Sequence, residues 1–531
     1  MKKLPLGIQN FGKIIEGDYV YVDKTEYIYK LIDGASYYFL SRPRRFGKSL
    51  LLDTICEVFR GEKELFKGLW IYDSGYDFAK HPVIRLDMSR TSNETPDILK
   101  NSILSHLKTC YSDEGLEIED ATVPDVFVKL ILMLHKKYEQ RVVVLIDEYD
   151  KPILDHITDY DKADANRDVL RGFYGILKSM DAHLRFIFIT GVSKFTKTSI
   201  FSGLNHLTDI TMAEDYANIC GIPVDSLDEY FSDHIESLKT SKRFKDQTNL
   251  KESILDWYDG YSWDGETKLI NPFSLLNFFN AKKFSAFWYS SGSPRFLLDL
   301  IKSKPESYLN IKNARISEDM LDSIEIEKIT VEPLLFQTGY LTVQEIQPLL
   351  DDLFYLLKIP NNEVRRAFSL HILSSLTESD DVSIGRARVD IHEALKAGDL
   401  EEMLEILRGL FASIPYSLHI EREAYYHSIF YTLLNVLGLD MDVEVSVSKG
   451  RVDAILEIED KAYIMEFKYK KSAPEASEEE KQKLFDTALS EAMEQINTRG
   501  YADKYKGSGK EIYKVAFAFL GRDSIGMRVE D

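Results

Sequence analysis

The amino-acid sequence predicts an α/β protein with a parallel sheet near its N-terminus, a helical middle and a second α/β domain near its C-terminus. Three observations support this fold class. The chain has 531 residues, which is too many for a single hydrophobic core. Residues 1–215 alternate short apolar strands with longer helical stretches, as parallel sheets covered by helices do. A second alternating pattern begins near residue 414.

Composition and charge narrow the functional classes. Apolar residues make up 44% of the chain and charged residues 29%, which is the usage of folded globular domains. The net charge is −21, so a generally basic nucleic-acid coat is excluded. Any binding to DNA or RNA has to come from a local basic site.

The cysteines and the apolar runs indicate the compartment. The chain has three cysteines without metal-ligand spacing, Cys56, Cys110 and Cys220, which favours a reducing, cytoplasmic location. No apolar run has the length of a membrane span, and Pro5 and Gly7 interrupt the first residues. We therefore expect neither a membrane span nor an export signal.

Five strands are predicted for the N-terminal sheet. They are rich in β-branched or aromatic residues and lie at 37–41, 83–88, 142–147, 185–190 and, with the weakest pattern, 207–212. The run 142–146 is apolar at every position, as expected of a strand buried on both faces.

A phosphate-binding loop follows the first predicted strand. Residues 42–49 read Arg-Pro-Arg-Arg-Phe-Gly-Lys-Ser, and a largely apolar helical run begins at Leu50. In such a loop backbone N–H groups surround the phosphates, the lysine contacts the β and γ oxygens, and the hydroxyl coordinates Mg²⁺. Gly47, Lys48 and Ser49 match this scheme. Arg42 stands at the first glycine position, so the backbone there must allow a β-carbon; the alternative interpretation is a basic surface turn.

An acidic pair supports the phosphate-loop interpretation. The apolar strand 142–146 leads into Asp147 and Glu148, as in a Walker B strand, where the aspartate holds the Mg²⁺ shell and the glutamate polarises the attacking water. The next strand ends near Thr190 and Ser193. If this strand lies between the two motifs, their hydroxyls could sense the γ-phosphate; otherwise they are turn-forming residues.

We therefore predict a site for ATP and Mg²⁺ on an N-terminal P-loop domain of the ASCE type. Ser49 and Asp147 are the predicted metal ligands and Glu148 the predicted catalytic residue. The remaining predicted nucleotide contacts lie in the loop or at the following strand end: Arg44, Arg45, Phe46, Gly47, Lys48, Leu50 and Thr190.

A second acidic site is predicted on a C-terminal hairpin. If Glu459-Asp460 forms its two-residue turn, Asp453 lies directly opposite Glu466. Two opposed carboxylates repel each other unless a cation lies between them, which indicates a Mg²⁺ site that could also take Mn²⁺. Lys468 shares the strand face of Glu466 and could stabilise charge during metal-assisted phosphodiester hydrolysis. A turn one residue later would oppose Lys468 to Asp453 instead, and an exposed salt-bridged hairpin is the alternative.

Five further residues are weaker candidates for the second site. Glu423 and His427 lie one helical turn apart and could face it, although such pairs are equally common on a plain helix surface. Gln495 and Arg499 have the same spacing, with Tyr501 nearby. These residues could bind a phosphate backbone.

Several segments together resemble a prokaryotic family that joins an N-terminal AAA-ATPase-like domain to a C-terminal PD-(D/E)xK nuclease-like domain. They are Tyr-Val-Asp-Lys-Thr at 21–25, the loop 41–49, Gly-Arg-Val-Asp at 450–453 and Glu-Phe-Lys at 466–468. The resemblance implies that an arginine-rich loop still binds nucleotide. It also implies a nuclease core of Asp453, Glu466 and Lys468, with Glu423 as a helix-borne acid, a modest role for Gln495, and Arg295 as a second sensor or a simple turn residue.

Four domains are expected: a P-loop ATPase core at 1–215, a helical lid or connector at 216–285, a winged-helix-like helical region at 286–410 and a restriction-endonuclease-like domain at 411–531. The leading hypothesis is an ATP- and Mg²⁺-dependent nuclease. Its expected partners are ATP or ADP and nucleic acid, DNA more than RNA, and an oligomer is possible. The alternatives are a nucleotide switch whose nuclease-like domain only binds nucleic acid, and an interaction module in which both sites have decayed.

Overall fold

The computed structural model describes residues 1–116, 122–195, 200–201, 204, 206–245, 247–290, 314–321, 330–349, 352–377, 381–414, 441–447, 450–471, 477–500, 505, 509–520 and 524–530. The chain forms two compact units, one of Met1–Gly292 with Lys312–Glu363 and one of Ser293–Ile311 with Val364–Asp531. Within the described ranges, every helix is too short or too polar to cross a bilayer.

A five-stranded parallel sheet forms the centre of the first unit. Its strand order is β2-β3-β4-β1-β5. The bounds are β1 Tyr37–Ser41, β2 Val83–Asp87, β3 Val142–Asp147, β4 Leu184–Gly191 and β5 Thr208–Asp209. The predicted strands are confirmed, the fifth over two residues only. Because β4 lies between β1 and β3, it also lies between the two predicted phosphate motifs.

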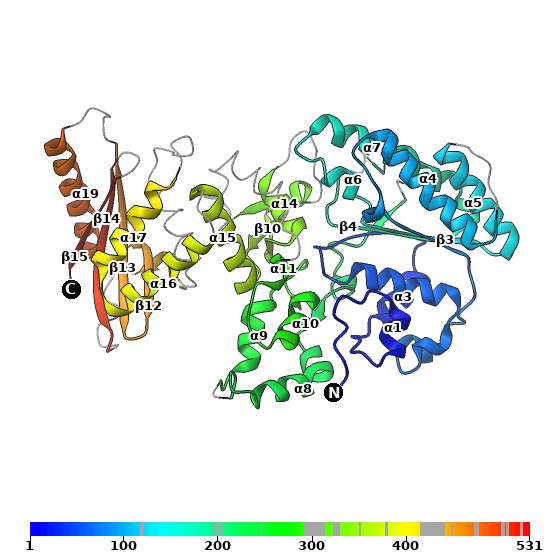
Figure 1. Cartoon of the computed structure of the whole chain (residues 1–531), viewed down its shortest axis with the longest axis horizontal. Coiled ribbons are helices and arrows are strands. Elements are labelled where there is room, and N and C mark those ends of the chain that lie inside the picture. Colours follow the sequence, from blue (N-terminus) through cyan, green and yellow to red (C-terminus); the bar gives the residue numbers. More distant parts are fainter. Residues whose placement is uncertain are drawn as a thin grey trace. The chain divides into compact units, whose positions relative to one another are not determined.

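Helices cover both faces of this sheet (Figure 1). On one face lie α1 Phe11–Glu16 and α3 Lys48–Arg60, and on the other α4 Pro96–Asp113, α5 Val123–Tyr138, α6 Lys151–Leu154 and α7 Tyr160–Ser179. Threonine caps begin α4 and α5, because the side chains of Thr95 and Thr122 accept from backbone N–H groups of the first turn. Phe127 of α5 stacks on Phe173 of α7 with 4.7 Å between ring centroids, so the helices on this face share one core.

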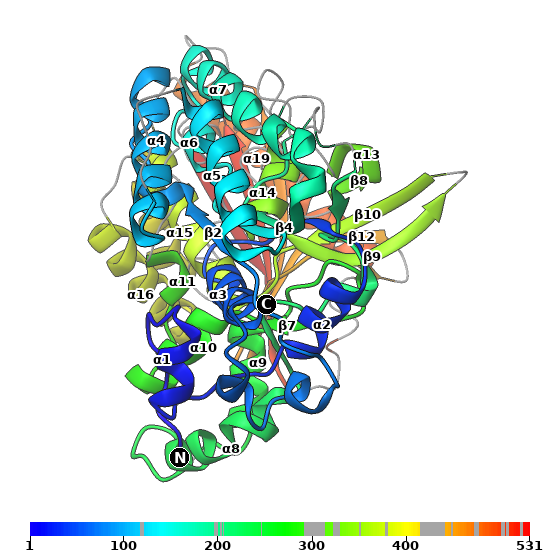
Figure 2. The ribbon, with the colours of Figure 1, turned by 90° about the vertical axis from the view of Figure 1, so that its right-hand side faces the viewer.

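The remainder of the first unit packs an aromatic helical cluster and a small antiparallel sheet. The cluster is built on α8 Ser226–Lys239, α9 Leu250–Tyr258 and α10 Pro272–Ala281, with the short pair β6 Ile222–Pro223 and β7 Leu269–Ile270. The sheet has the order β8-β10-β9, and β9 and β10 form a long hairpin (Figure 2). The other elements are α2 Thr25–Asp33, α11 Phe287–Ser290, α13 Glu318–Leu321, α14 Val331–Thr338, β8 Arg315–Ser317, β9 Thr342–Leu349 and β10 Asp352–Lys358.

The second unit contains a five-stranded mixed sheet of order β11-β12-β13-β14-β15. Only the β13–β14 pair is parallel, because α19 connects these two strands as a crossover helix. The strands are β11 Met441–Val447, β12 Gly450–Ile458, β13 Lys461–Lys470, β14 Glu511–Leu520 and β15 Ser524–Glu530, and the helices are α15 Asn362–Thr377, α16 Asp381–Ala397, α17 Leu400–Ala412 and α19 Glu478–Arg499.

The start of α19 corrects a sequence prediction. The polar, glutamate-rich stretch 472–483 predicts a solvated loop that enters a helix at Leu484, but α19 already begins at Glu478. Ser477 and Glu480 form a capping box in which each side chain accepts from the backbone N–H of the other. This reciprocal cap stabilises the first helical turn, and the three glutamates of that turn lie at the end of the helix that favours negative charge. The helix packs through Ala488, Ala492 and Ile496 against one face of the sheet.

Candidate functional site

The phosphate loop joins β1 to α3 through two left-handed backbone positions. Arg42 extends β1, because its N–H donates to the Gly191 carbonyl of β4 at 3.2 Å. The left-handed positions are Arg45 (φ 65°) and Gly47 (φ 100°), of which the second has the steric freedom of glycine. Helix α3 begins immediately at Lys48. Its unpaired N-terminal N–H groups therefore lie at the loop, which is suited to binding an anion.

Arg42 occupies the position of the first glycine, and its contacts show how the loop accommodates a side chain there. Its side chain is fully buried and donates from Nη1 to the carbonyls of Ser41 at 2.9 Å and Thr211 at 2.7 Å. The guanidinium carbon lies 4.0 Å from the ring centroid of Trp263, a cation–π distance. Arg42 thus anchors the loop to the interior and does not face a phosphate.

Three other residues of the loop, Arg44, Arg45 and Phe46, contact aromatic side chains. The ring of Phe46 is buried against Tyr261 and Trp263 at centroid distances of 5.1 and 5.2 Å. Arg45 lies with its guanidinium carbon 4.9 Å from the ring centroid of Phe273, and the Arg44 carbonyl accepts from Trp288 Nε1 at 3.0 Å. The region 216–285, expected to be a helical lid or connector, therefore contacts the phosphate loop directly through Tyr261, Trp263 and Phe273.

Lys48 occupies a buried position beside the acidic strand end. Its ammonium donates to the carbonyls of Arg42 at 2.8 Å and Pro43 at 3.0 Å. Burial lowers its pKa, and the carboxylates of Glu148, Asp147 and Asp150 act in the opposite direction. The predicted loop and the predicted Walker B residues thus converge, and a phosphate could replace the two carbonyls as the partner of the ammonium.

Asp147 is positioned by the neighbouring strand. Its Oδ1 accepts from the buried hydroxyl of Thr190 at 2.6 Å and from the N–H of Glu148 at 3.1 Å. Glu148 itself has a left-handed φ of 49°, a strained conformation for a residue with a β-carbon. The strand order thus brings Thr190 into contact with Asp147.

Sequence reasoning missed Asp150, which links the two turns behind the site. Its carboxylate is buried and accepts from the backbone N–H groups of Val192 at 3.0 Å and Ser193 at 2.6 Å. Burial raises the pKa of Asp150 to about 6. Ser193, a predicted γ-phosphate sensor, therefore contributes its backbone to this link.

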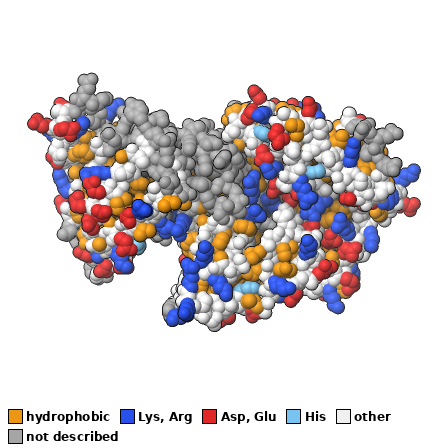
Figure 3. All heavy atoms as spheres, viewed as in Figure 1, with side chains coloured by type: hydrophobic (Ala, Val, Ile, Leu, Met, Phe, Trp, Pro, Cys, Tyr) orange, Lys and Arg blue, Asp and Glu red, His pale blue; other side chains and the backbone are white. Residues whose placement is uncertain are grey.

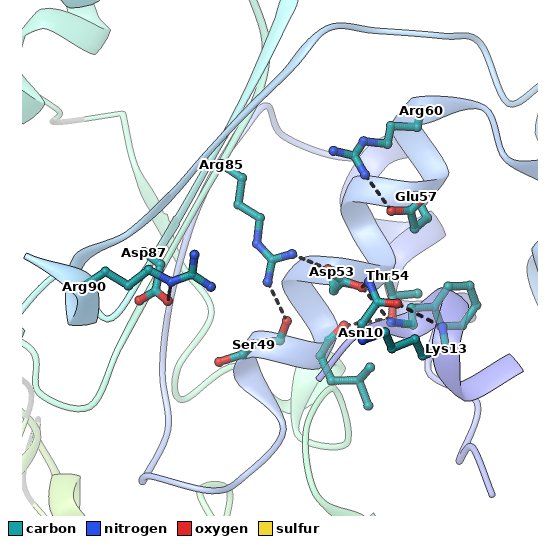
Figure 4. Close-up of polar contacts among 12 residues, drawn as sticks. Asn10, Lys13, Ser49, Asp53, Thr54, Glu57, Arg60, Arg85, Asp87 and Arg90 are labelled. Atoms are coloured by element: carbon teal, nitrogen blue, oxygen red, sulfur yellow. Dashed lines mark hydrogen bonds and ion pairs between the residues drawn. The ribbon is translucent and has the colours of Figure 1, made fainter. Parts of the chain in front are cut away.

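A second missed network orients the first turns of α3 (Figure 4). Arg85 on β2 forms an ion pair with Asp53 and also points to the carbonyl of Ser49, at 3.5 Å. Asp53 further accepts from the Phe11 N–H at 2.6 Å and from Asn10 Nδ2 at 3.2 Å. These partners come from distant parts of the chain, so no local pattern pointed to them.

The donors at this site suit Mg²⁺ held together with a nucleotide. Within the described ranges no three His, Cys, Asp or Glu side chains gather as a metal cluster. A magnesium ion bound with a phosphate needs only one or two protein oxygens, because phosphate and water supply the others. The Ser49 hydroxyl and the Asp147 carboxylate are oxygen donors of this type.

An apolar pocket adjoins the phosphate loop. Its empty volume is about 620 Å³, part of which is open to solvent. The lining residues are mostly apolar: Pro5, Val20, Tyr21, Val22, Lys24, Phe46, Gly47, Leu50, Leu51, Ile219, Cys220, Gly221, Ile222, Phe231, Pro272 and Leu276. A mostly apolar pocket with few polar groups is typical of small-ligand sites. Three of these residues, Phe46, Gly47 and Leu50, were predicted as nucleotide contacts, and no other sequence signal indicated the pocket.

The hairpin register of the second site is confirmed. Ala454 pairs with Met465 and Ile458 with Lys461, which is the register that the Glu459-Asp460 turn predicts. The pairing becomes irregular beyond Ala454: the Asp453 N–H donates to Glu466 Oε2 at 3.4 Å, and the Phe467 N–H donates to Asp453 Oδ2 at 2.9 Å.

Glu466 is a buried carboxyl with a strongly shifted pKa. Burial, with the nearby charge of Asp453, raises its pKa to about 7, although Lys468 acts in the opposite direction. Lys468 Nζ lies 3.4 Å from Glu466 Oε1. Two carboxylates and an ammonium are thus gathered on the neighbouring inner strands β12 and β13, and a divalent cation between the carboxylates would favour their charged forms.

The two strand faces follow the predicted alternation. Ile464, two residues before Glu466, packs in the core beneath α19, whereas Phe467 stacks on Phe517 of the opposite face. Gln495 is half-buried on α19, and Lys470 pairs with Glu491 of the same helix at 2.6 Å. Glu423, His427, Arg295 and Tyr501 lie outside the described residues, as does the side chain of Arg499.

Comparison with known proteins supports both halves of this arrangement. Residues 5–201 match the family described as a predicted AAA-ATPase, and residues 421–527 match the PD-(D/E)XK nuclease superfamily. The whole chain is similar to an "Uncharacterized protein in vnfD 5'region" of Azotobacter chroococcum mcd 1. The identity is 36% over 538 residues, which cover 100% of this chain and 99% of that protein.

Proposed function

Because the chain belongs to a family that joins an N-terminal predicted AAA-ATPase domain to a C-terminal PD-(D/E)XK nuclease superfamily domain, we propose that it is an ATP- and Mg²⁺-dependent nuclease. In this proposal, ATP binding and hydrolysis control phosphodiester cleavage. The observation that carries the nuclease half is the contact of Lys468 and the Asp453 backbone with the buried Glu466 carboxylate. A purely structural salt bridge gives no reason to oppose two carboxylates on neighbouring strands.

The ATPase step assigns a role to each residue of the first site. Lys48 exchanges its carbonyl partners for the β and γ phosphate oxygens, and Ser49 and Asp147 hold Mg²⁺. Glu148 accepts a proton from the attacking water, while the Thr190 hydroxyl keeps Asp147 in place through its 2.6 Å hydrogen bond. The base and ribose occupy the apolar pocket beside Gly47 and Leu50.

The nuclease step uses the three residues of the hairpin. Asp453 and Glu466 would hold Mg²⁺ or Mn²⁺, which supplies a Lewis acid and lowers the pKa of a bound water. Lys468 places a positive charge where negative charge accumulates on the scissile phosphate. Glu466 must be ionised to act as a ligand.

A chain of contacts inside the first unit supports control by ATP. Trp288 donates from Nε1 to the carbonyl of Arg44 in the phosphate loop at 3.0 Å, and from its backbone to Glu363 at 2.8 Å. Glu363 lies in the first turn of α15, and the chain passes into the second unit at Val364. A change in the phosphate loop thus has a short path to the helix that continues into the nuclease-like unit.

Replacing Trp288 by phenylalanine should weaken this control, because the variant keeps an aromatic ring but loses the Nε1–H donor to Arg44. We expect ATP to stimulate cleavage about three- to tenfold less than in the wild type, the effect of one hydrogen bond, with basal cleavage unchanged. Cleavage rates with and without ATP measure this. Trp70→Phe, at a 45% exposed tryptophan, is the matched control. Equal stimulation in both variants would contradict the role of Trp288.

Glu363 gives a pH-dependent prediction. Burial raises its pKa from 4.5 to about 7, so the folded protein binds this proton more tightly than the unfolded chain. The ionised carboxylate therefore lowers stability as pH rises from about 5 to above 7. Glu363→Gln should match the wild type in urea denaturation at pH 5 and be more stable by up to about 3 kcal/mol at pH 8. An equal difference at both pH values would show that Glu363 is charged throughout.

The alternative function is a nucleotide switch whose nuclease-like domain binds nucleic acid without cutting it. The charge distribution favours it: the net charge is −21, and acidic and basic side chains are interspersed on the face drawn in Figure 3. Lys470 next to the site is also already paired with Glu491. Such a surface attracts a polyanion weakly.

Incubation of the purified protein with nucleic acid separates these functions. Single- and double-stranded DNA and RNA are incubated with Mg²⁺ or Mn²⁺, with and without ATP. Cleavage that needs both the metal and ATP supports the nuclease, with DNA expected to be cut in preference to RNA. If every polymer stays intact while ATP is hydrolysed, the switch is correct. We further propose a cytoplasmic location, consistent with three free thiols, and an oligomer that supplies additional basic surface.

A further inference from the structure

Tyr21, Val22 and Lys24 line the apolar pocket, and the segment 21–25 that contains them is held firmly in place. The Tyr21 hydroxyl lies 3.3 Å from the Thr54 hydroxyl of α3. Asp23 accepts from the backbone N–H groups of Thr25 at 2.8 Å and Trp70 at 2.7 Å. Thr25 in turn accepts from the Ile71 N–H at 3.1 Å. The polar side chains of this segment, except that of Lys24, are therefore engaged in fixing its shape.

Lys24 is different, because its ammonium has no hydrogen-bond or ion-pair partner in the described part of the chain. It lines the pocket, and burial lowers its pKa to about 8. Its nearest charged or titratable neighbours are Cys220, which also lines the pocket, and Asp23, which is already held by backbone N–H groups. Burying an ammonium without a hydrogen-bond acceptor costs free energy. We therefore expect a bound ligand to supply the acceptor.

The surroundings of Lys24 indicate which part of a ligand supplies the acceptor. The pocket begins at Gly47 of the phosphate loop, and its walls include Val22, Ile222 and Leu276. These walls suit an aromatic ring, whereas a charged phosphate chain in an apolar pocket would be desolvated without compensation. Lys24 can only donate hydrogen bonds. The ligand group beside it must therefore be apolar on its faces and carry an acceptor on its edge.

We propose that Lys24 contacts the base of the bound nucleotide, donating a hydrogen bond to a ring nitrogen of the purine. This inference rests on the proposed ATP site but goes beyond it, because it assigns recognition of the base to a residue outside the phosphate motifs. Lys48 binds the phosphates and Lys24 the base. The two lysines should therefore be separable by ligands that carry only one of these groups.

The test compares ATP with inorganic tripolyphosphate, which has the phosphates but no base. Lys24→Met keeps most of the side-chain length without the ammonium. We expect it to bind ATP about 10- to 100-fold more weakly, the effect of one charged hydrogen bond, and to bind tripolyphosphate as the wild type does. Lys48→Met should lose both ligands. Lys30→Met, at a lysine 49% exposed on helix α2, which begins one residue after Lys24, is the matched control and should bind both normally.

A second measurement uses the unmodified protein and thus does not depend on the folding of a variant. Among 1-deaza-, 3-deaza- and 7-deaza-ATP, each lacking one ring nitrogen, one should bind the wild type about 10-fold or more weakly than ATP, and this difference should vanish in Lys24→Met. Equal binding of all three analogues, or equal loss of ATP and tripolyphosphate in Lys24→Met, would overturn the inference while leaving the ATP site intact. A wild type that binds neither ATP nor tripolyphosphate would instead contradict the proposed function.

Discussion

Replacing Lys48 by alanine should reduce ATP turnover by about 100-fold or more, the scale of losing a charge aimed at a transferred phosphoryl group. Lys48 is the loop lysine whose ammonium is buried between the Arg42 and Pro43 carbonyls and within the electrostatic reach of Asp147 and Glu148. Lys48→Ala removes the positive charge that the proposal aims at the β and γ oxygens. Phosphate release measures ATP turnover, and equilibrium binding of a fluorescent ATP analogue shows how far the variant has lost nucleotide binding.

Two controls make this result interpretable. Lys100→Ala removes a lysine that is 52% exposed on α4 and should change neither binding nor turnover. Lys48→Met keeps the packing of the side chain without its charge, so it should lose turnover as Lys48→Ala does while melting at or near the wild-type temperature. Turnover that survives in both Lys48 variants would show that the phosphate loop is not the catalytic site.

Glu466→Gln should abolish phosphodiester cleavage, again by about 100-fold or more, because a neutral amide replaces a carboxylate ligand of the metal. Burial and the charge of Asp453 hold the pKa of Glu466 at about 7, so this carboxyl is poorly stabilised until a cation is present. The glutamine has nearly the same shape and carries no charge to bury. We therefore expect the variant to remain folded and to hydrolyse ATP normally.

Nicking of supercoiled DNA with Mg²⁺ and ATP is the measurement. Lys468→Ala should lose nicking as well, since it removes the ammonium 3.4 Å from Glu466, whereas Glu459→Gln, at a turn glutamate 58% exposed, should cut like the wild type. If the wild type cuts and Glu466→Gln cuts equally well, the cleavage occurs at another site. If only the wild type and Glu459→Gln cut, the hairpin is the nuclease centre.

Much of the first site was predictable because its parts are local in the chain. The loop geometry depends on Gly47 and on a helix that begins at Lys48, and both are visible in eight consecutive residues. The approach of Thr190 to the acidic strand end could be predicted only on the condition that its strand lies between the two motifs. Its hydroxyl reaches Asp147 because β4 lies between β1 and β3, and strand order is a property of the whole sheet.

The hairpin likewise combines a feature that is local in the chain with one that depends on tertiary packing. A two-residue turn and the two-residue period of a strand are sufficient to oppose Asp453 and Glu466, and the observed pairing has this register. The pattern gave no indication that Glu466 is completely buried, which depends on α19 and β14 covering it. The raised pKa therefore follows from packing rather than from the motif.

By itself, the sequence determined the strands, the phosphate loop, the acidic strand ends and the hairpin register. Each of these depends on the regular repeat of side-chain directions along the backbone and on neighbours a few residues apart. Only the tertiary structure decided that Arg42 is an anchor against Trp263 and that Asp53 connects α3 to Arg85. It also decided that Lys24 lines a pocket where its ammonium has no partner among the residues that the structure describes. These features join residues that are tens to hundreds of positions apart. Their contacts, and the desolvation that shifts their pKa values, exist only once the chain path has brought them together.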